Sequence, residues 1–436
     1  MSLQEVSLRA RVAWLVRQPL ISNAGYLLGM SVLPGFLGFV FWAIASRLYP
    51  PAAIGTSAAV ISAVTLVAGI SQLGIGTSLV RFLPESQSPR HLLSSAYTLS
   101  IMLALFIGSI YLAGLSFWSP ALIVIVNNGL YVAGFLTFVI VTTLGSVVRD
   151  TFVARRRAHY ALIHTIIVNI ARLILIVLLA YLGIAGLVGS VAIGFGLALG
   201  ISLWCFIPRV EPGYRFFAAL SLPELALIIP YSMGNYIAGL LIQIAPTILP
   251  LIILNVLGPV SSAHAYVALM IGSLLASPGI ALATSAFAEG ANSSKSATST
   301  LAKATIIGLI VSVPIAIVFS IAAPWCLLLF GPSYVEEGTG LLRWLVMGVP
   351  FVVLSQFYFT YLRLKKQVRR LILMSSIVMV MTLVISIIMM PRYGIVTNGI
   401  GLFIGYGLVI IINSGNIFRK QVLKKAFIEI ISYSRD

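Results

Sequence analysis

The chain has 436 residues, of which 60% are hydrophobic and only 8% are charged, and its mean hydropathy is +1.09. One soluble core could not bury so much apolar surface, so the composition excludes an ordinary soluble domain. The net charge of +17 is spread along the chain rather than gathered with aromatic residues in one patch, which argues against nucleic acid as a partner.

Twelve apolar runs of roughly 18 residues or more predict an all-α polytopic membrane protein. In the first half these runs cover residues 22–47, 54–80, 92–116, 119–148, 158–182 and 184–207. In the second half they cover residues 222–254, 260–287, 300–330, 339–363, 369–390 and 395–418. The expected parts are an N-terminal segment (1–21), a first six-helix lobe (22–208), a linker (209–221), a second six-helix lobe (222–418) and a C-terminal helix on the membrane surface (419–436).

The basic residues test this count, because Lys and Arg should collect in every second loop, on the cytoplasmic side. They do collect there. The groups are Arg9, Arg11 and Arg17; Arg81 and Arg90; Arg149 and Arg155–Arg157; Arg209 and Arg215; Lys295 and Lys303; Arg363, Lys365, Lys366, Arg369 and Arg370; and Arg419, Lys420, Lys424, Lys425 and Arg435. Both termini are therefore expected in the cytoplasm and the chain in the plasma (inner) membrane, with anionic lipids near its cytoplasmic face.

The two halves share a weak repeat. The pattern Ser22, Tyr26, Gly29 recurs 210 positions later as Ser232, Tyr236, Gly239, and similar offsets relate Pro50 to Pro259 and Gly183 to Gly394. Chance similarity between apolar segments is the alternative. Because each half holds an even number of spans, a true duplication gives two parallel six-helix repeats related by an axis along the membrane normal.

The sequence shows no pattern of residues that is typical of a catalytic site. The ten Asp and Glu residues avoid the predicted mid-membrane positions, and the His residues do not show metal-ligand spacing. Cys205 and Cys326 fall on opposite sides of the membrane, which leaves no disulfide. We therefore expect no enzyme activity, no cofactor and no metal. Sodium coupling through backbone carbonyls stays open, although a span carboxylate for ion coupling is lacking.

Arg172 is the basic residue deepest in a predicted span, about fourteen residues or ~21 Å from the cytoplasmic start of its helix. Thr165 and Asn169 precede it at helical spacing and share its face. A guanidinium matches phosphate oxygens bidentately and stays charged, so this stripe predicts a wall of a cavity for an anionic headgroup. Bonding to carbonyls of a broken helix, or snorkelling outward, is the alternative. Arg47 and Arg343, at outer helix ends, extend a positive path or simply anchor the interface.

The first helix of each lobe carries polar residues that suit sugar hydroxyls. Tyr26 is matched by Tyr236, Asn23 is matched loosely by Asn235, and Gln243 lies seven residues beyond Tyr236 on the same side. Hydrogen bonds between helices are the alternative role for each of them. Prolines interrupt both helices, so bends that gate a cavity are expected. They are Pro34, Pro246 and Pro250.

Several short motifs follow one another in a characteristic order. They are Asn23–Tyr26, Ala45–Pro50 with Ile54–Gly55, Leu79–Glu85 and Leu329–Tyr334. In these motifs the chain resembles the Wzx-like polysaccharide flippases of the multidrug/oligosaccharidyl-lipid/polysaccharide (MOP) exporter superfamily. The resemblance implies a V-shaped pair of MATE-like lobes with a cationic cavity for a pyrophosphate, for which Arg172 and, less directly, Arg47 and Arg343 are the candidates.

The resemblance also implies a function. A polyprenyl-pyrophosphate-linked oligosaccharide would be moved from the inner to the outer leaflet by alternating access, for cell-surface polysaccharide biosynthesis such as that of lipopolysaccharide. The expected partners are this lipid-linked substrate, membrane lipids and glycan-assembly proteins, and we expect a monomer. A MATE-type multidrug exporter or other lipid exporter is the first alternative. A membrane glycosyltransferase or polymerase is the second, which the short external loops and their lack of carboxylates disfavour.

Overall fold

The computed structural model describes residues 19–214, 222–292 and 297–417. Residues 1–18, 215–221 and the predicted C-terminal helix thus lie outside the described residues. The described chain consists of helices joined by short turns, without a strand. Eleven of these helices are long and apolar enough to cross a membrane, and a twelfth contains the shorter apolar stretch Leu33–Leu48. The prediction of an all-α protein with about twelve spans is therefore confirmed.

The first half forms seven longer helices and several short turns. The longer helices are α2 (Pro19–Leu48), α3 (Pro51–Ser71), α4 (Ile75–Phe82), α5 (Pro89–Ala113), α7 (Gly129–Ala154), α8 (Ala158–Leu178) and α9 (Ile184–Ile201). Short helical segments connect or extend them: η1 (Leu83–Glu85), α6 (Leu115–Trp118), η2 (Pro120–Ile125), η3 (Ala180–Leu182), η4 (Ser202–Phe206) and α10 (Ile207–Val210).

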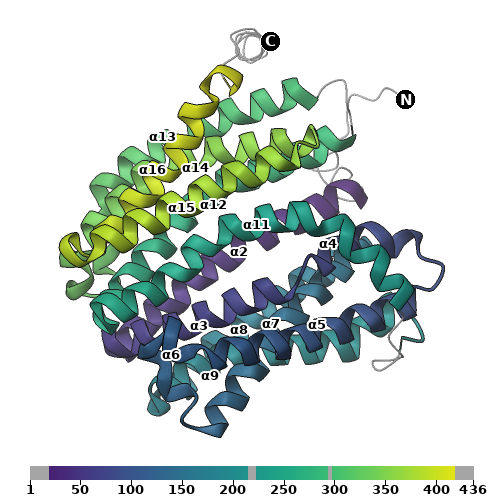
Figure 1. Ribbon diagram of the computed structural model, residues 1–436, viewed down its shortest axis with the longest axis horizontal. Helices are drawn as coiled ribbons and strands as arrows, with labels where there is room; N and C mark the ends of the chain where they lie inside the picture. Colours follow the sequence, from purple (N-terminus) through teal and green to yellow (C-terminus); the bar gives the residue numbers. More distant parts are fainter. Residues whose placement is uncertain (1–18, 215–221, 293–296, 418–436) are drawn as a thin grey trace, which may run out of the picture.

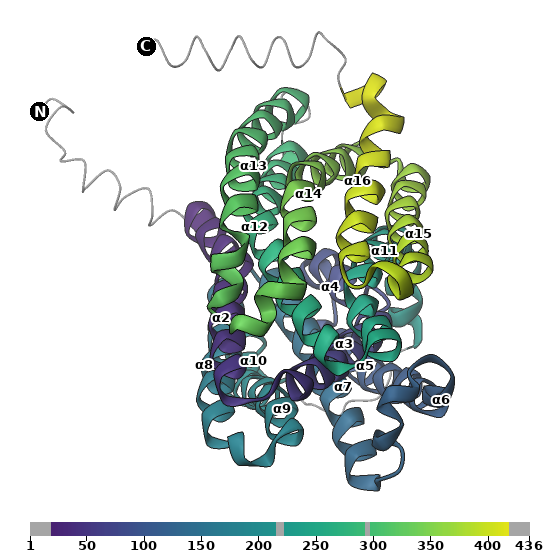
Figure 2. The same ribbon diagram turned by 90° about the vertical axis from the view of Figure 1, so that its left-hand side faces the viewer.

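The second half forms six long helices. They are α11 (Leu222–Leu257), α12 (Pro259–Asn292), α13 (Ala297–Leu328), α14 (Pro332–Leu364), α15 (Val368–Tyr393) and α16 (Val396–Ile417). Figure 1 shows α2 and α11 lying between the remaining helices of the two halves. Figure 2, turned by 90°, again separates α12–α16 from α5 and α7–α9.

Two predicted spans of the first half differ from the observed helices. The predicted span 54–80 breaks at Leu73 and Gly74, whose φ angles of 41° and 76° lie in the left-handed region that glycine tolerates. The predicted span 119–148 begins too early. Residues 120–125 form a short 3-10 turn, and α7 starts only at Gly129, where the Asn128 side chain accepts a hydrogen bond of 2.9 Å from the Leu130 amide. Hydropathy alone does not locate either turn, because the residues around both turns are apolar.

Matching turns confirm the internal repeat. Arg156 and Lys366, 210 positions apart, both adopt a left-handed conformation, with φ angles of 54° and 55°. The same reverse hydrogen bond closes both turns, because the Arg157 amide donates to the Phe152 carbonyl at 2.8 Å and the Gln367 amide to Leu362 at 2.9 Å. We call these the basic turns, residues 155–157 and 365–367, and the opposite end of the bundle, where α2 ends and α12 begins, the Tyr49 end.

Helix packing follows the same symmetry. The first helix of each half packs on the fifth long span of its own half, α2 on α8 and α11 on α15. It also packs on the second span of the other half, α2 on α12 and α11 on α3, while α3 and α12 contact each other. The largest cluster of buried apolar residues accordingly crosses between the halves, joining Phe41 and Ile54 to Ala263 and Phe330. These interlocked first helices hold the two lobes together.

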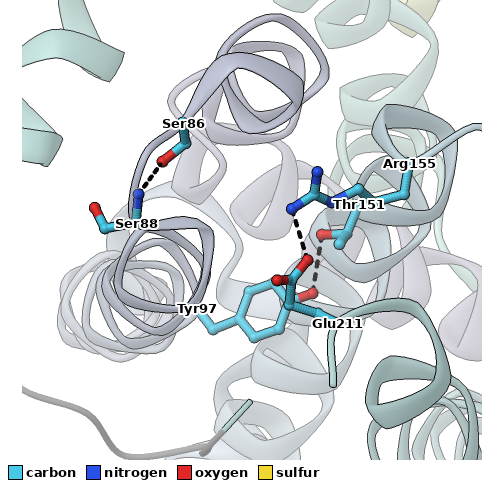
Figure 3. A network of polar contacts seen from close by, with 6 residues as sticks. All are labelled: Ser86, Ser88, Tyr97, Thr151, Arg155 and Glu211. Atoms are coloured by element: carbon cyan, nitrogen blue, oxygen red, sulfur yellow. Dashed lines mark hydrogen bonds and ion pairs between the residues drawn. The ribbon is translucent and has the colours of Figure 1, made fainter. Parts of the chain in front are cut away.

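An ion pair fixes the first basic turn to the segment that follows α10. The Arg155 guanidinium lies 2.6 Å from the Glu211 carboxylate, and only 24% and 11% of the two side chains are exposed. Figure 3 shows this pair beside Tyr97, whose hydroxyl donates to Thr151 at 2.9 Å. The beginning of the predicted linker (209–221) is thus bound to the first lobe.

Candidate functional site

Arg172 lies on α8 and is held by a chain of hydrogen bonds along that helix. Its Nη2 donates to Asn169 Oδ1 at 2.5 Å, and Asn169 Nδ2 donates to the Thr165 carbonyl at 2.7 Å. The side chains of Thr165 and Asn169 are only 4% and 3% exposed. The predicted polar stripe therefore exists, but in this structure Asn169 orients the guanidinium and the Thr165 hydroxyl donates to the Ala161 carbonyl, so neither side chain faces open space.

The guanidinium of Arg172 points from α8 toward α2. Its central carbon lies 5.0 Å from the centroid of the Phe41 ring, and a β-carbon added to Gly38 would come within 3.3 Å of Nη2. Gly38 thus leaves the room that the cation occupies. On the second lobe, the Tyr266 ring of α12 packs against Trp42, the residue next to Phe41, with centroids 4.7 Å apart. The cation therefore sits between α8 and α2, and α2 in turn packs on α12.

No carboxylate in the described part of the chain forms an ion pair with Arg172. Its Nε is shielded from solvent and lacks a hydrogen-bond partner there. Buried charges are ordinarily paired or fully hydrogen-bonded, so this arrangement leaves a planar cation with a free donor. An anionic ligand of matching geometry would complete its interactions.

The two outer arginines bind α13 instead of joining Arg172. Arg47 Nη2 donates to the carbonyl of Leu329 at 2.9 Å, just beyond the end of α13, and Arg343 Nε donates to the Ser320 carbonyl at 3.2 Å. A cation at a helix C-terminus interacts favourably with the helix dipole. Arg47 is at such an end and anchors it, whereas Arg343 lies inside α14 and binds a residue inside α13. The three cations are therefore not brought together.

The polar residues predicted on α2 and α11, the first helices of the two lobes, do not form one group in the structure. The Tyr236 hydroxyl donates to the carbonyls of Gly69 and Ile70 at the end of α3, so it joins the two lobes. Asn23 and Tyr26 lie on α2 and Asn235 lies on α11, but their side chains are outside the described set. Proline-interrupted α11 is tied to α12, because Ser262 donates to the Pro250 carbonyl at 3.1 Å.

Gln243, the remaining predicted site residue, lines a cavity of about 340 Å³ inside the second lobe. Helices α11, α12, α14 and α16 form its walls. The polar and aromatic lining residues are Gln243, Tyr266, Ser273, Trp344, Gln356, Phe403 and Tyr406. The sequence reading missed all of these except Gln243, although an amide such as Gln356 within an apolar span was a usable signal.

A titratable pair with one buried partner was also missed. The side chain of His264 is 4% exposed and that of Glu337 is 49% exposed. The predicted span 339–363 begins too late, because α14 starts at Pro332 and so includes Glu336 and Glu337 in its first turns. Glu337 lies 3.1 Å from Nδ1 of His264, which is buried on α12. In the described parts of the chain, no cluster of three His, Cys, Asp or Glu residues is placed to hold a metal ion.

Comparison with known proteins places this geometry in context. Residues 20–264 match the family model described as polysaccharide biosynthesis protein, and residues 230–388 match the MatE model. No curated protein sequence matches the chain.

Solved structures share the fold at low sequence identity. The lipid II flippase MurJ, in an inward closed conformation, is 14% identical with a TM-score of 0.70, over 94% of this chain and 93% of its own. An inward-facing multidrug resistance MATE family transporter of the MOP superfamily is 14% identical with a TM-score of 0.67, over 92% of this chain and 99% of its own. A MOP superfamily transporter from Pyrococcus furiosus is 15% identical with a TM-score of 0.58, over 97% of this chain and 98% of its own.

Proposed function

Because the chain belongs to the polysaccharide biosynthesis protein family, we propose that it is a flippase for a polyprenyl-pyrophosphate-linked oligosaccharide. The substrate moves from the inner to the outer leaflet, for assembly of a cell-surface polysaccharide. The protein acts as a transporter and not as an enzyme. It needs no cofactor in this role.

The observation that carries the proposal is the unpaired Arg172 between α8 and α2, where α2 lies against the second lobe. A charged side chain at this depth costs roughly 2.5–3.5 kcal/mol on insertion scales. No described carboxylate offsets that cost by pairing with it. A pyrophosphate offers two groups of oxygens that a guanidinium binds bidentately. Arg172 therefore receives the headgroup, and Asn169 holds the guanidinium in position.

The orientation follows from the basic turns. Lys and Arg concentrate on the cytoplasmic side of membrane proteins, so the basic turns and both chain termini face the cytoplasm of the plasma membrane. The Tyr49 end then faces outward. The substrate enters when the site between the lobes is open on the basic-turn side. The protein acts as a monomer. Glycan-assembly proteins supply the substrate and receive it after transport.

Alternating access requires the lobes to separate at one end while they close at the other. At the Tyr49 end, the Ser262 hydroxyl contacts the Gly55 carbonyl at 3.4 Å, and Arg47 binds the end of α13. At the basic-turn end, Tyr236 bonds to the end of α3. These short contacts between lobes are the bonds that a rocking motion would break in turn.

The test is transport in proteoliposomes that contain a fluorescent polyprenyl-pyrophosphate-linked sugar. Arg172→Ala should reduce translocation by roughly 100-fold or more, because charge-assisted hydrogen bonds to the pyrophosphate are lost. Arg172→Lys should restore part of the rate, since it keeps the charge but not the bidentate geometry. Arg392→Ala is the matched control, because Arg392 is exposed and stacks only on Tyr393. Normal translocation by Arg172→Ala would refute the proposed headgroup site.

The match of residues 230–388 to the MatE model favours a second candidate, export of organic cations. The two candidates differ in the charge of the substrate. Efflux of an organic cation from proteoliposomes, unaffected by Arg172→Ala, would support this alternative. Transfer of sugar by the purified protein would instead indicate a glycosyltransferase.

A further inference from the structure

We propose that the cavity in the second lobe binds an uncharged sugar, the one attached next to the pyrophosphate. This inference rests on the proposed flippase function and adds a specificity to it. The cavity lies between α11, α12, α14 and α16, and its volume of about 340 Å³ is within the range of small-molecule sites, roughly 300–1,000 Å³.

The lining of the cavity is polar but uncharged. Its polar groups are two amides, two phenols, one indole and one hydroxyl, and none of its described lining residues is Asp, Glu, Lys or Arg. Neutral donors and acceptors on aromatic and aliphatic walls suit a ligand with many hydroxyl groups and apolar C–H faces. A sugar has both features.

The two amides are free to bind such a ligand. The side chains of Gln243 and Gln356 make no hydrogen bond to any other described residue, in contrast to Ser273, which donates to the Met270 carbonyl at 2.8 Å. Each amide carries two donors and an acceptor that need partners once water is displaced. Hydroxyl groups of a bound sugar can supply both kinds of partner.

The aromatic side chains form a fixed wall. The rings of Trp344 and Phe403 meet edge to face with centroids 5.4 Å apart, and Phe351 supports Phe403 from the other side at 5.0 Å. Rings held at such angles offer flat apolar surfaces to a pyranose without losing side-chain entropy on binding.

A row of packed aromatic residues lies between the cation and the cavity. Arg172 stacks on Phe41, and the next residue, Trp42, packs its ring 4.7 Å from the ring of Tyr266. Tyr266 is itself a lining residue of the cavity. A headgroup on Arg172 would therefore have its first sugar on the side of Tyr266, directed into the second lobe.

The lack of charge makes the site selective. A uronic acid would bring a carboxylate into the cavity without a cation to pair with it, and burying an unpaired charge is unfavourable. A neutral hexose avoids that penalty. The cavity should therefore distinguish the sugars that follow the pyrophosphate by charge.

The experiment measures equilibrium binding of three probes to the purified full-length protein in detergent. The probes are polyprenyl pyrophosphate without sugar, the same lipid carrying glucose, and the same lipid carrying glucuronic acid. The glucose probe should bind roughly 10-fold more tightly than the sugar-free probe, as expected for two neutral hydrogen bonds. The glucuronic acid probe should lose that advantage.

Variants of the cavity residues then test whether the cavity causes the tighter binding of the glucose probe. In the double variant Gln243→Leu/Gln356→Leu, the ratio between glucose and sugar-free affinities should fall to about one, and each single variant should lower it by roughly 3-fold. Gln367→Leu, in the second basic turn, is the matched control and should keep the full ratio. Arg172→Ala should weaken both probes by the same factor.

The outcomes separate the two proposals. A ratio that stays at its original value in the folded single variants, or a glucuronic acid probe that binds as well as glucose, would overturn the sugar site. Equal binding of all probes regardless of Arg172 would overturn the flippase proposal instead. The single variants keep the test decisive even where the double variant fails to fold.

Discussion

The two lobes share one backbone plan but differ in the chemistry of their interiors. The left-handed residues Arg156 and Lys366 close equivalent turns, and Gly183 and Gly394 begin the last helix of each lobe with φ angles of 59° and 66°. Only the first lobe, however, carries the Arg172 and Asn169 pair, whereas the second contains the uncharged cavity around Gln356. Backbone turns were thus kept after duplication while the interior residues diverged, so each lobe can bind a different part of one substrate.

The largest expected effect comes from moving the cation between lobes. The position equivalent to Arg172 is Leu383 on α15, which lacks an amide support because Val380 stands at the position equivalent to Asn169. The double variant Arg172→Leu/Leu383→Arg should therefore remain at least roughly 100-fold impaired in translocation. Restored translocation in proteoliposomes would mean that either lobe can carry the cation, and it would contradict the proposed difference between the lobes.

A smaller change sharpens the role of Asn169 as a positioning residue. Asn169→Asp places a carboxylate beside the guanidinium, which should neutralise Arg172 and lower the affinity for inorganic pyrophosphate by roughly 10-fold or more. Asn169→Leu should reduce it by a similar or lesser factor. Asn413→Asp, a buried asparagine bonded to Tyr358 in the second lobe, is the matched control. An undiminished pyrophosphate affinity in Asn169→Asp, measured by calorimetry, would contradict this role.

The contact between the lobes at the Tyr49 end can be tested by adding one methyl group. A β-carbon at Gly55 would overlap the carbonyl oxygen of Pro259, so Gly55→Ala should disfavour closure there by about 1–3 kcal/mol. Spin labels at Leu48 and Val260, both exposed, should report a larger population at long distance. Gly200→Ala meets no atom within 4 Å and should leave the distances as they are. Equal distance distributions in both variants would mean that the lobes do not move apart at Gly55.

The smallest effect concerns the two basic turns. Arg155 is paired with Glu211 at 2.6 Å, whereas no described ion pair includes the equivalent Lys365. Glu211→Gln should lower the free energy of unfolding of the first lobe by about 1.5–3 kcal/mol, because a mostly buried charged hydrogen bond is lost. Lys365→Gln should change it by less than about 0.5 kcal/mol. Thermal unfolding of both variants in the same detergent measures the difference, and equal losses would show that the turns are equivalent after all.

Much of the fold could be predicted from the sequence because hydropathy reports membrane crossing directly. Apolar runs and the register of the repeat gave the helix class and the pairing of Gly183 with Gly394. Helix ends were less accessible. The breaks at Gly74 and before Gly129 depend on backbone angles and on one asparagine cap, which apolar neighbours conceal.

The candidate site was predictable only in part. A lone arginine in an apolar span is unusual enough to select Arg172 on its own. The partners of Arg47, Arg343 and Tyr236 were not predictable, because each of the three binds a backbone carbonyl outside its own helix. Carbonyls occur at every residue, so no pattern marks which one will be bound.

The sequence by itself determined that this protein is a helical membrane bundle with an internal repeat, because hydrophobicity and charge act residue by residue along the chain. Tertiary structure decided which of the polar residues meet. Arg172 comes to lie beside Phe41, and Trp42 beside Tyr266, only because α2 packs on both α8 and α12. The uncharged cavity likewise exists only where α11, α12, α14 and α16 fail to fill the space between them, a property of packing that no single segment carries.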